Sequence, residues 1–572
     1  MIILGINGNI LNRSSIVNES SACIIKDGKI IAAVAQERVS RKKVDGRFPI
    51  EAIKEVLSIA KLSIEDVTYV ASPSLHPYFN SKKYLKSIIT TFFDSRVLLY
   101  SKLKSFTYYT IYNKFKTKSK IETDILGKKF DICFNDHHKC HAASAFYSSG
   151  FENSLVVTLD GGGDGLDGSV YFGTESKMIK IMEIPHFQSI GTMYSAVTKD
   201  LGFKRHRHEG KITGLAAYGN PDPVRLKLEN LILYNKKKHR FISKQVAKLH
   251  LDINNKSNIF HPLLKKHTKE DIAAVAQELF EREVLKFIKD AILEAKKKGF
   301  TSKNICLAGG CFANVKVNQK IFRDNNFNDI FIFPAMGDDG ISVGAGFLTY
   351  FKKSNDKIKL NSKINDAYLG REYSDQEIIK SLEKHKLNFH KSKNIALEVA
   401  KLLSEGKVVA RFNGRMEYGP RSLGNRSIIA SPFDKKINDW LNKKLNRNEF
   451  MPFAPSIIEE KANEYLLDYN KETASKYMTM TYDIIGDMGK KIPAVVHIDN
   501  TARPQVVNQV SNSSFHNIIY EFYKITGVPV LLNTSFNMHE DPIVMSPNDA
   551  VRNFINGNLD VLAISDYIVI SN

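Results

Sequence analysis

Short apolar runs separated by polar turns open the chain. Residues 2–6 are apolar, a polar loop follows as far as Ser20, and further apolar runs at 22–25 and 30–34 flank the pair Asp27-Gly28. An Asp-Gly pair between apolar runs favours a tight hairpin. We therefore expect a strand, a polar loop and a β-hairpin at the start of the fold.

A strand and a helix are predicted just before residue 150. Phe130–Phe134 is a short apolar strand, Asp136 can cap a helix that runs to Ser149, and Gly150 supplies its stop. The Lys-, Tyr- and Phe-rich stretch before them, Tyr78–Lys129, has a helical pattern. We interpret it as an inserted cap.

Strands and helices alternate through the rest of the chain, and no tandem repeat is visible in the sequence. A polar, lysine-rich segment at 352–363 is the expected linker to a second domain that starts near Ile364. The pattern predicts strands at 155–159, 169–173, 304–307, 330–333, 408–412 and 528–532, and helices within 188–201, 269–298 and 341–351.

Size and composition are those of a globular protein with more than one domain. The chain has 572 residues, of which 43% are hydrophobic and 25% charged. No apolar run reaches the roughly 18 residues of a membrane span, so we expect a cytoplasmic protein without a membrane partner. The five cysteines form no CxxC pair, which argues against a disulfide framework.

The chain is strongly basic, with a formal net charge of +21. Its lysines are dispersed rather than clustered, which favours a solvated basic surface over a nucleic-acid-binding face. Attraction for nucleotides and other anions follows in either case. No pattern indicates an oligomeric state.

Two histidines one helical turn apart are the first candidates for chemistry. His137 and His141 lie on one face of the predicted helix, whereas His138 is expected to face another side. Asp338, in a loop after a predicted strand, is the candidate third ligand. Two imidazoles and one carboxylate with open positions suit Fe²⁺, Mn²⁺ or Zn²⁺; the alternative is a pair of surface histidines.

Three small-residue loops are candidates for phosphate binding, because their backbone N–H groups are unobstructed. Each alone is compatible with an ordinary turn, but together they favour a nucleotide cleft. The residues concerned are Gly161, Gly162, Gly163, Asp164, Gly210, Lys211, Gly309 and Gly310, with Asn314 just after the last pair.

Long motifs in both halves of the chain resemble the NodU/CmcH/TobZ carbamoyltransferases. In the first half they are His137-His138-x-x-His141-Ala142-Ala143-Ser144-Ala145, Asp160-Gly161-Gly162-Gly163-Asp164-Gly165, Glu209-Gly210-Lys211-x-x-Gly214-Leu215-Ala216, Leu307-Ala308-Gly309-Gly310 and Gly337-Asp338-x-Gly340. In the second half they are the run from Gly414 to Ser427, Pro452-Phe453-Ala454-Pro455-Ser456, His497-x-Asp499-x-Thr501-Ala502-Arg503 and the run from Thr526 to Asn537.

The resemblance implies an α/β chain of two domains. Residues 1–355 would be a two-lobed, actin-like (ASKHA) carbamoyl-transfer domain with the metal site, and residues 356–572 a YrdC-like α/β domain. In the family the second domain converts ATP (with Mg²⁺) and carbamoyl phosphate into carbamoyl-adenylate. The first domain then passes the carbamoyl group to a hydroxyl of a small-molecule or sugar acceptor, beside a metal that is usually iron.

The same resemblance assigns roles in the second domain. Arginines in its motifs are suited to bidentate phosphate contacts, and a Ser-x-Asn pair belongs to the nucleotide pocket. The phosphate-binding candidates are Arg415, Arg421 and Arg503, and the pocket residues are Asn533, Thr534, Ser535 and Asn537.

The sequence departs from the family at three sites, one of which is Lys43-Val44-Asp45 after the first hairpin, where the family usually has Lys-His-Asp. Asn18 and Glu19 stand where the family has a His-Asp pair, so the acid/base role of that histidine is vacant unless Glu19, His206 or His208 fills it. Asn446-Arg447-Asn448 replaces a Lys-x-Arg run, and Met451 stands where an arginine is common. This loss of cations is expected to weaken phosphate binding, with Arg447 compensating in part.

Two alternative hypotheses about the function remain open. A tRNA threonylcarbamoyl transferase would use related domains, although the run from Gly414 to Ser427 and the dispersed charge argue against it. The departures also allow a divergent member with another donor or acceptor, or a non-catalytic nucleotide-binding paralogue.

Overall fold

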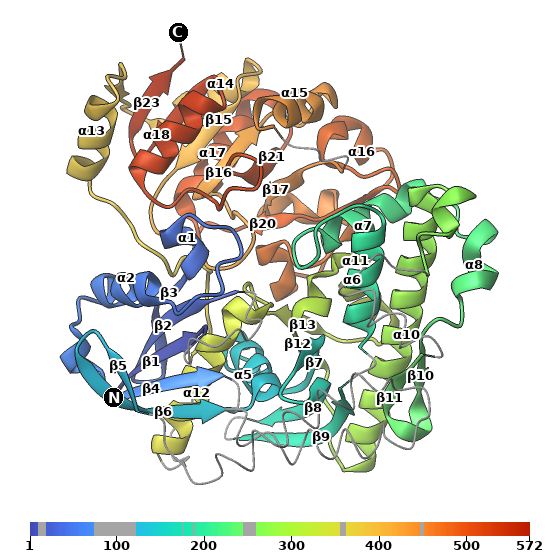
Figure 1. Ribbon diagram of the computed structural model, residues 1–572. Coiled ribbons are helices and arrows are strands. Elements are labelled where there is room, and N and C mark those ends of the chain that lie inside the picture. The colour runs from blue at the N-terminus through green and yellow to red at the C-terminus, as the bar shows by residue number, and fades with distance from the viewer. Residues whose placement is uncertain are drawn as a thin grey trace.

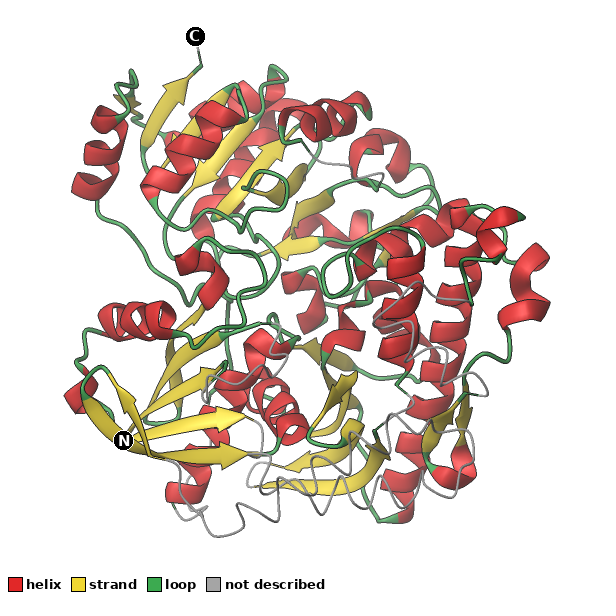
Figure 2. Ribbon diagram, in the orientation of Figure 1, coloured by secondary structure: helices red, strands yellow, loops and turns green. Residues whose placement is uncertain are grey.

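The computed structural model describes residues 1–9, 19–73, 122–174, 177–186, 189–243, 259–354, 362–446 and 451–571. Within these ranges the chain is a mixed α/β protein built on three large sheets (Figures 1 and 2). Two sheets belong to the first 353 residues, and one eight-stranded sheet belongs to the last part of the chain. No helix in the described part is both long enough and apolar enough to cross a lipid bilayer.

The first sheet has the strand order β3-β2-β1-β4-β6-β5. Strands β1, β2 and β3 form the predicted antiparallel meander, with Asp27 and Gly28 in the tight turn, while β4 and β6 run parallel to β1. Helices α1 (Gln36–Ser40) and α2 (Ile50–Ala60) follow β3. The strands are β1 Ile2–Asn7, β2 Ser21–Lys26, β3 Lys29–Ala35, β4 Tyr69–Pro73, β5 Glu122–Ile125 and β6 Lys128–Asn135.

One prediction about this sheet is wrong. Residues 122–129, which were expected to continue a helical stretch as far as Lys129, instead form β5 and the start of β6, which pair antiparallel. Leu126 and Gly127 both have positive φ in the turn of this pair, which a continuous helix would not permit. Residues 74–121 of the expected cap lie outside the described residues.

The second sheet repeats the topology of the first. Its order is β13-β12-β7-β8-β9: β7, β8 and β9 form an antiparallel meander, and β12 and β13 continue the sheet in parallel from β7. The predicted glycine-rich hairpin is therefore confirmed as β7–β8. The strands are β7 Asn153–Gly163, β8 Leu166–Thr174, β9 Lys177–Pro185, β12 Asn304–Ala308 and β13 Asp329–Ile332.

Helices α5 (His137–Ser149) and α12 (Ile341–Lys353) pack against each other between these two sheets. As predicted, Asp136 caps α5 by accepting a hydrogen bond from the Lys139 N–H, and Gly150 ends it in the left-handed region. Within α5 all residues but one are buried, since it touches protein on every side. This position brings the start of α5 to the edge where β7 and β12 end.

A helical layer covers the other face of the second sheet, with the long helix α10 at its centre (Figure 1). Thr268 and Asp271 form a capping box that begins α10. The small pair β10 (Leu233–Asn235) and β11 (Arg240–Ile242) lies beside it. The helices of this layer are α6 Ile190–Asp200, α7 Glu209–Leu215, α8 Asp222–Leu228, α10 Lys269–Lys297 and α11 Val315–Asp324.

The third sheet has the order β14-β23-β22-β15-β16-β21-β17-β20. Helices α14 and α17 pack on one face of it. Its strands are β14 His390–Lys391, β15 Val409–Phe412, β16 Arg426–Ala430, β17 Ala454–Ile458, β20 Gln505–Val507, β21 Val530–Ser535, β22 Val561–Ile564 and β23 Tyr567–Ile570. Beside it lie α13 Asp375–Lys384, α14 Ile395–Ser404, α15 Lys436–Lys444, α16 Met488–Lys491, α17 Ser513–Thr526, α18 Pro547–Asn556 and the pair β18 Tyr482–Asp483 and β19 Thr501–Ala502.

Two buried charged side chains, Arg426 and Glu417, hold the loop that joins β15 to β16. The guanidinium of Arg426 is fully buried, donates hydrogen bonds to the Asn413 (2.7 Å) and Gly414 (3.1 Å) carbonyls, and lies 3.6 Å from the centre of the Phe412 ring. The Glu417 carboxylate accepts three backbone N–H groups of the same loop. These bonds fix the conformation of the long motif between Gly414 and Ser427.

Candidate metal centre

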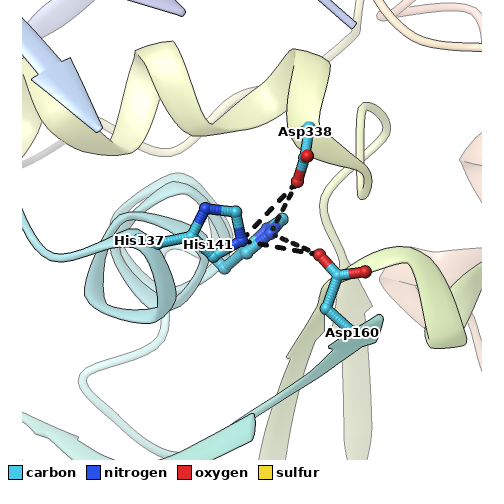
Figure 3. Close-up of side chains that lie close together, drawn as sticks. All are labelled: His137, His141, Asp160 and Asp338. Carbon is cyan, nitrogen blue, oxygen red and sulfur yellow. Dashed lines mark hydrogen bonds and ion pairs between the residues drawn. The ribbon is translucent and has the colours of Figure 1, made fainter. Parts of the chain in front are cut away.

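Four side chains from distant parts of the sequence converge at one point. His137 and His141 come from α5, Asp160 from the end of β7, and Asp338 from the turn before α12 (Figure 3). One ligand atom of each lies within 4.8 Å of all the others. The Nε2 atom of His141 is 3.2 Å from Asp160 Oδ2 and 3.4 Å from Asp338 Oδ1, and Nε2 of His137 is 3.5 and 3.6 Å from the same oxygens.

The donors fit a divalent transition metal. Both imidazoles are buried, and within the described ranges neither His137 Nε2 nor Asp338 Oδ1 has a hydrogen-bond partner although both atoms are shielded from solvent. Buried polar atoms are normally satisfied, so two such atoms facing each other at 3.6 Å indicate a missing shared partner. Two nitrogens and two carboxylate oxygens suit Fe²⁺, Mn²⁺ or Zn²⁺.

The negative charges of the two carboxylates favour protonation of the two imidazoles. Burial opposes protonation, but the carboxylates of Asp338 and Asp160 outweigh it and raise the pKa of His137 to about 9. The pKa of His141 is raised for the same reason. Burial also opposes ionisation of Asp160, yet the two imidazoles hold its pKa well below 3.8. A metal ion would replace these protons as the compensating positive charge.

Asp160 was not predicted as a ligand. The sequence motif places it first in the glycine-rich loop, where its neighbours suggested phosphate binding. A carboxylate at the end of a buried strand, followed by glycines that allow close approach, is the signal that could have identified it. Its other oxygen, Oδ1, accepts a hydrogen bond from the Gly161 N–H at 2.6 Å, which orients the carboxylate.

The glycines of the β7–β8 hairpin make room for the centre. A Cβ atom on Gly163 would lie 2.2 Å from Cδ2 of His137, and one on Gly162 would lie 2.4 Å from the His186 ring. Asp164, in the left-handed region, accepts a hydrogen bond from the His137 N–H at 2.8 Å. Gly163 and Asp164, both predicted phosphate-loop residues, thus position the helix that carries His137, whereas Gly162 makes room for the ring of His186. A Cβ on Gly161, in contrast, would meet no atom within 4 Å.

Gly309 and Gly310 lie beside the same centre. Gly309 has a φ of 101°, and a Cβ there would lie 2.3 Å from the Leu159 carbonyl oxygen, so the close approach of β12 and β7 requires glycine. A Cβ on Gly310 would lie 3.2 Å from Asp160 Oδ1. The loop after β12 therefore borders the metal ligands, as the strand-end position predicts.

The other loop residues of the first domain lie in neighbouring helices. Gly210 and Lys211 fall in the first turn of α7, where Lys211 is buried. Asn314 caps α11 and exchanges two side-chain hydrogen bonds with Gln277 of α10, at 2.9 and 3.1 Å. These bonds give the Asn314 amide a fixed orientation at the base of the helical layer.

His138 turns away from the metal ligands, as predicted, and bonds to Thr158 and the Leu166 carbonyl.

Glu19 lies next to the turn that carries Asp338. Its Oε2 would be 3.0 Å from a Cβ on Gly337. Burial, together with the charges of Asp339 and Asp338, raises the pKa of Glu19 well above 4.5. Burial likewise raises the pKa of Asp339 to about 6. Asn18, the other predicted catalytic position, lies outside the described residues.

The predicted second-domain residues divide into two groups. Arg415 donates hydrogen bonds to the backbone carbonyls of Ile31, Leu369 and Gly370, at 2.9, 2.9 and 3.0 Å, and so joins the first sheet to the second domain. Asn533 is buried within the sheet, where its amide donates to Ser456 and Gln505. The remaining residues are partly exposed. Thr534 and Ser535 end β21 and Asn537 follows it, Arg503 follows β19, and Arg421 lies in the loop before β16.

Met451 ends the segment with the altered cations and contacts α7. Residues 447–450, which include the predicted Arg447, lie outside the described residues. Met451 packs so closely on α7 that a Cβ on Gly214 would lie 1.6 Å from its sulfur. An apolar contact between domains therefore occupies the position where the family resemblance suggests an arginine.

Two family models match the chain. The model of the carbamoyltransferase N-terminus matches residues 9–347, and that of the carbamoyltransferase C-terminus matches residues 400–571. The chain belongs to the NodU-type carbamoyltransferase family. It is accordingly a transferase family member, and the candidate metal ligands, the glycine loops and α7 all lie within the segment matched by the N-terminal carbamoyltransferase model.

Two relatives resemble this family member over nearly its full length. The uncharacterized protein sll1178 of Synechocystis is 31% identical, with 98% of this chain and 96% of the relative covered. Nodulation protein NolNO of Sinorhizobium fredii is 30% identical, over 100% of this chain and 82% of NolNO. Among solved structures, HypF of T. kodakarensis is 15% identical with a TM-score of 0.30, over 63% of this chain and 48% of HypF.

Proposed function

We propose that this protein moves a carbamoyl group from carbamoyl phosphate, through carbamoyl-adenylate formed with ATP, to a hydroxyl of a small-molecule or sugar acceptor. The observation that carries the proposal is the cluster of His137, His141, Asp160 and Asp338 in a chain of the carbamoyltransferase family. A metal held there would polarise a carbonyl or phosphoryl oxygen during transfer to a hydroxyl.

We assign residues 1–355 to an actin-like transfer domain and residues 356–572 to a YrdC-like domain. The repeated topology of the first two sheets supports the first assignment, because actin-like domains consist of two lobes of the same design. The eight-stranded sheet with the motif from Gly414 to Ser427 supports the second.

In the transfer domain, the four clustered residues would hold Fe²⁺, or Mn²⁺ or Zn²⁺ in its place. When bound, such an ion supplies Lewis acidity toward a carbonyl or phosphoryl oxygen. Asp164 and Gly163 keep the helix that carries His137 in position, and Gly309 and Gly310 leave the edge beside Asp160 unobstructed. The backbone of these loops is suited to the phosphate of the adenylate.

In the second domain, Arg421 and Arg503 are the proposed contacts to the phosphates of Mg²⁺-ATP and carbamoyl phosphate. Ser535 and Asn537 follow the buried strand β21, whose Asn533 is locked by Ser456 and Gln505. A rigid strand that ends in short polar side chains is suited to orienting a nucleotide. Arg415 serves here as a structural link, since it donates to three carbonyls.

The test is to incubate the purified, metal-loaded protein with carbamoyl phosphate and ATP, and to measure pyrophosphate and carbamoyl-adenylate. We expect pyrophosphate only when both substrates are present. The Asp160→Asn variant is the matched comparison: it should still form pyrophosphate and carbamoyl-adenylate, because the change lies in the first domain. If the wild-type protein forms neither product, this donor chemistry is wrong.

A further inference from the structure

The position of the Asp338 carboxylate depends on the turn that carries it. This carboxylate is 30% exposed, and its Oδ1 lies 3.4 Å from Nε2 of His141 and 3.6 Å from Nε2 of His137 (Figure 3). Among the described residues, Oδ1 accepts no hydrogen bond that would orient it. A side chain that is neither enclosed nor hydrogen-bonded takes its place from its backbone. The backbone of the turn, residues 337–340, is therefore what presents Asp338 to the imidazoles.

Hydrogen bonds to its carbonyl groups hold this turn within the first domain. The Gly337 carbonyl accepts the Gly340 N–H at 3.1 Å, which closes the turn on itself. The Asp338 carbonyl accepts the side-chain amide of Asn7, at 2.7 Å, and Asn7 is the last residue of β1. The first sheet thus supports the turn from one side.

The next carbonyl of the turn, that of Asp339, receives donors from both domains. The Ser21 hydroxyl, at the start of β2, donates to it at 2.6 Å. The Tyr418 hydroxyl donates to the same oxygen, although Tyr418 lies in the long motif of the second domain. Both side chains are buried, and the Tyr418 ring meets that of Phe333 edge to face, with 6.3 Å between the ring centres. A side chain of the second domain therefore bonds to the residue next to a metal ligand.

Neighbouring contacts hold Tyr418 against the first domain. The Gly419 carbonyl accepts a hydrogen bond from the buried guanidinium of Arg38, in α1, at 2.8 Å. Gly419 has a φ of 120°, and a Cβ atom there would lie 2.7 Å from the Pro334 carbonyl oxygen, so glycine is needed for this close approach. On the other side of Tyr418, the Glu417 carboxylate accepts three N–H groups of its own loop. Withdrawal of Tyr418 from the turn would break these contacts.

We propose that Tyr418 is a positioning residue of the metal centre, through which the second domain sets the place of the ligand Asp338. The path is short, because the Tyr418 hydroxyl holds the Asp339 carbonyl and the Asp338 carboxylate stands on the same turn. This inference rests on the proposed metal centre. Arg421, a proposed phosphate contact, lies three residues after Tyr418. The loop that would bind the carbamoyl donor therefore also holds a residue that would bind the metal.

The experiment compares Tyr418→Phe, Ser21→Ala, the double variant and the control Tyr477→Phe, each as the full-length, metal-free protein titrated with Mn²⁺. Electron paramagnetic resonance measures the free Mn²⁺ and hence the affinity, and the spectrum of the bound ion reports the geometry of its ligands. Thermal unfolding without metal checks that each variant is folded.

Tyr477 is the matched control because its side chain differs from that of Tyr418 in the one feature under test. It is buried, and its ring lies 6.2 Å from that of Phe331, in the strand β13 that precedes the turn. Among the described residues its hydroxyl makes no hydrogen bond. Tyr477→Phe thus removes a buried hydroxyl close to the turn without removing a bond to it.

We expect Tyr418→Phe to bind Mn²⁺ about 10-fold more weakly, because loss of an outer partner of a metal ligand costs about 10- to 100-fold in affinity. The spectrum of bound Mn²⁺ should also change, which a general loss of stability would not cause. Ser21→Ala should change both in the same direction. Since the two hydroxyls share one carbonyl, the loss in the double variant should differ from the product of the single losses. Tyr477→Phe should match the wild type.

Wild-type affinity and spectrum in Tyr418→Phe, or an equal change in Tyr477→Phe, would overturn the positioning role while leaving the proposed metal centre intact. Losses that simply multiply in the double variant would contradict the route through the Asp339 carbonyl. Absence of Mn²⁺ binding to the wild-type protein would instead overturn the metal centre, and the role of Tyr418 with it.

Discussion

Nε2 of His141 lies 3.2 Å from Oδ2 of Asp160, although one residue is on a helix and the other ends a strand of the sheet beneath it. The contact adds a second carboxylate to the three ligands that the sequence indicates. It also explains why a glycine-rich hairpin follows Asp160 directly: the ligand helix must approach the strand closely. The following predictions depend on this arrangement.

Replacing Asp160 by asparagine should weaken metal binding while leaving the fold intact. Removing even an outer partner of a metal ligand costs about 10- to 100-fold in affinity, so we expect a loss at least that large. Titration calorimetry with Fe²⁺ or Mn²⁺ under anaerobic conditions measures it. Asp339→Asn is the control, because Asp339 is next to Asp338 but outside the cluster; an equal loss in both variants would contradict a four-residue site.

Metal affinity should rise with pH between about 6.5 and 9. Imidazole binds metal only when it is deprotonated, and the carboxylates raise the pKa of His137 from 6.5 to about 9. For the metal-free protein the sign of the effect on stability is opposite. The folded-state pKa of His137 lies above its unfolded value, so its stabilising contribution is full below pH 6.5 and is lost as the pH rises through about 9.

Calorimetry in two buffers of different ionisation enthalpy checks the pH dependence of metal binding. Proton release on metal binding at pH 7 is expected, and it should disappear near pH 10. In the metal-free protein, His137 should contribute less to thermal stability above pH 9 than below pH 6.5. The difference in unfolding temperature between wild type and His137→Gln should therefore be smaller above pH 9. A pH-independent affinity would contradict protonated ligands in the metal-free centre.

Gly163→Ala should disturb the centre, whereas Gly161→Ala should not. The new Cβ at 163 would lie 2.2 Å from the His137 ring, but the one at 161 would meet nothing within 4 Å. Overpacking of this kind costs roughly 1–3 kcal/mol. We expect lower metal affinity and a lower unfolding temperature for Gly163→Ala alone. Equal behaviour of the two variants would contradict the packing of His137 against the hairpin.

Arg426→Met should destabilise the second domain strongly. The substitution leaves carbonyls such as those of Asn413 and Gly414 buried without a donor, at a cost of about 3 kcal/mol or more. Arg552→Met is the control, because Arg552 is half exposed and its ion pair, among the described residues, is with Asp549 on its own helix; its loss should cost less than about 1 kcal/mol. Urea unfolding followed by tryptophan fluorescence of Trp440 in this domain measures both.

Local features of the fold could be predicted from the sequence, because their causes are local. Asp136 and Gly150 bound α5 as expected, and Asp27-Gly28 forms the turn of the first hairpin. The i,i+4 spacing of His137 and His141 was enough to place both rings on one face. Asp338 could be added because parallel strands end at a common edge of a sheet.

Features that depend on long-range packing could not be predicted in this way. Asp160 joins the candidate metal centre only because α5 packs on β7, so the sequence motif alone suggested phosphate binding. Arg415 and Arg426 occur in one motif with the same side chain, yet the first holds the domain junction and the second is fully buried. The repeated topology of the first two sheets was also invisible, since it is a repeat of strand order rather than of sequence.

Anomalous scattering at the iron edge, from a crystal of the Fe²⁺-loaded protein, tests the central claim most directly. We predict one strong peak among Nε2 of His137, Nε2 of His141 and the carboxylates of Asp160 and Asp338, at about 2.0–2.2 Å from each of these four donors. A protein that binds iron with its peak elsewhere, or with Asp160 outside bonding distance, would contradict the four-residue metal centre.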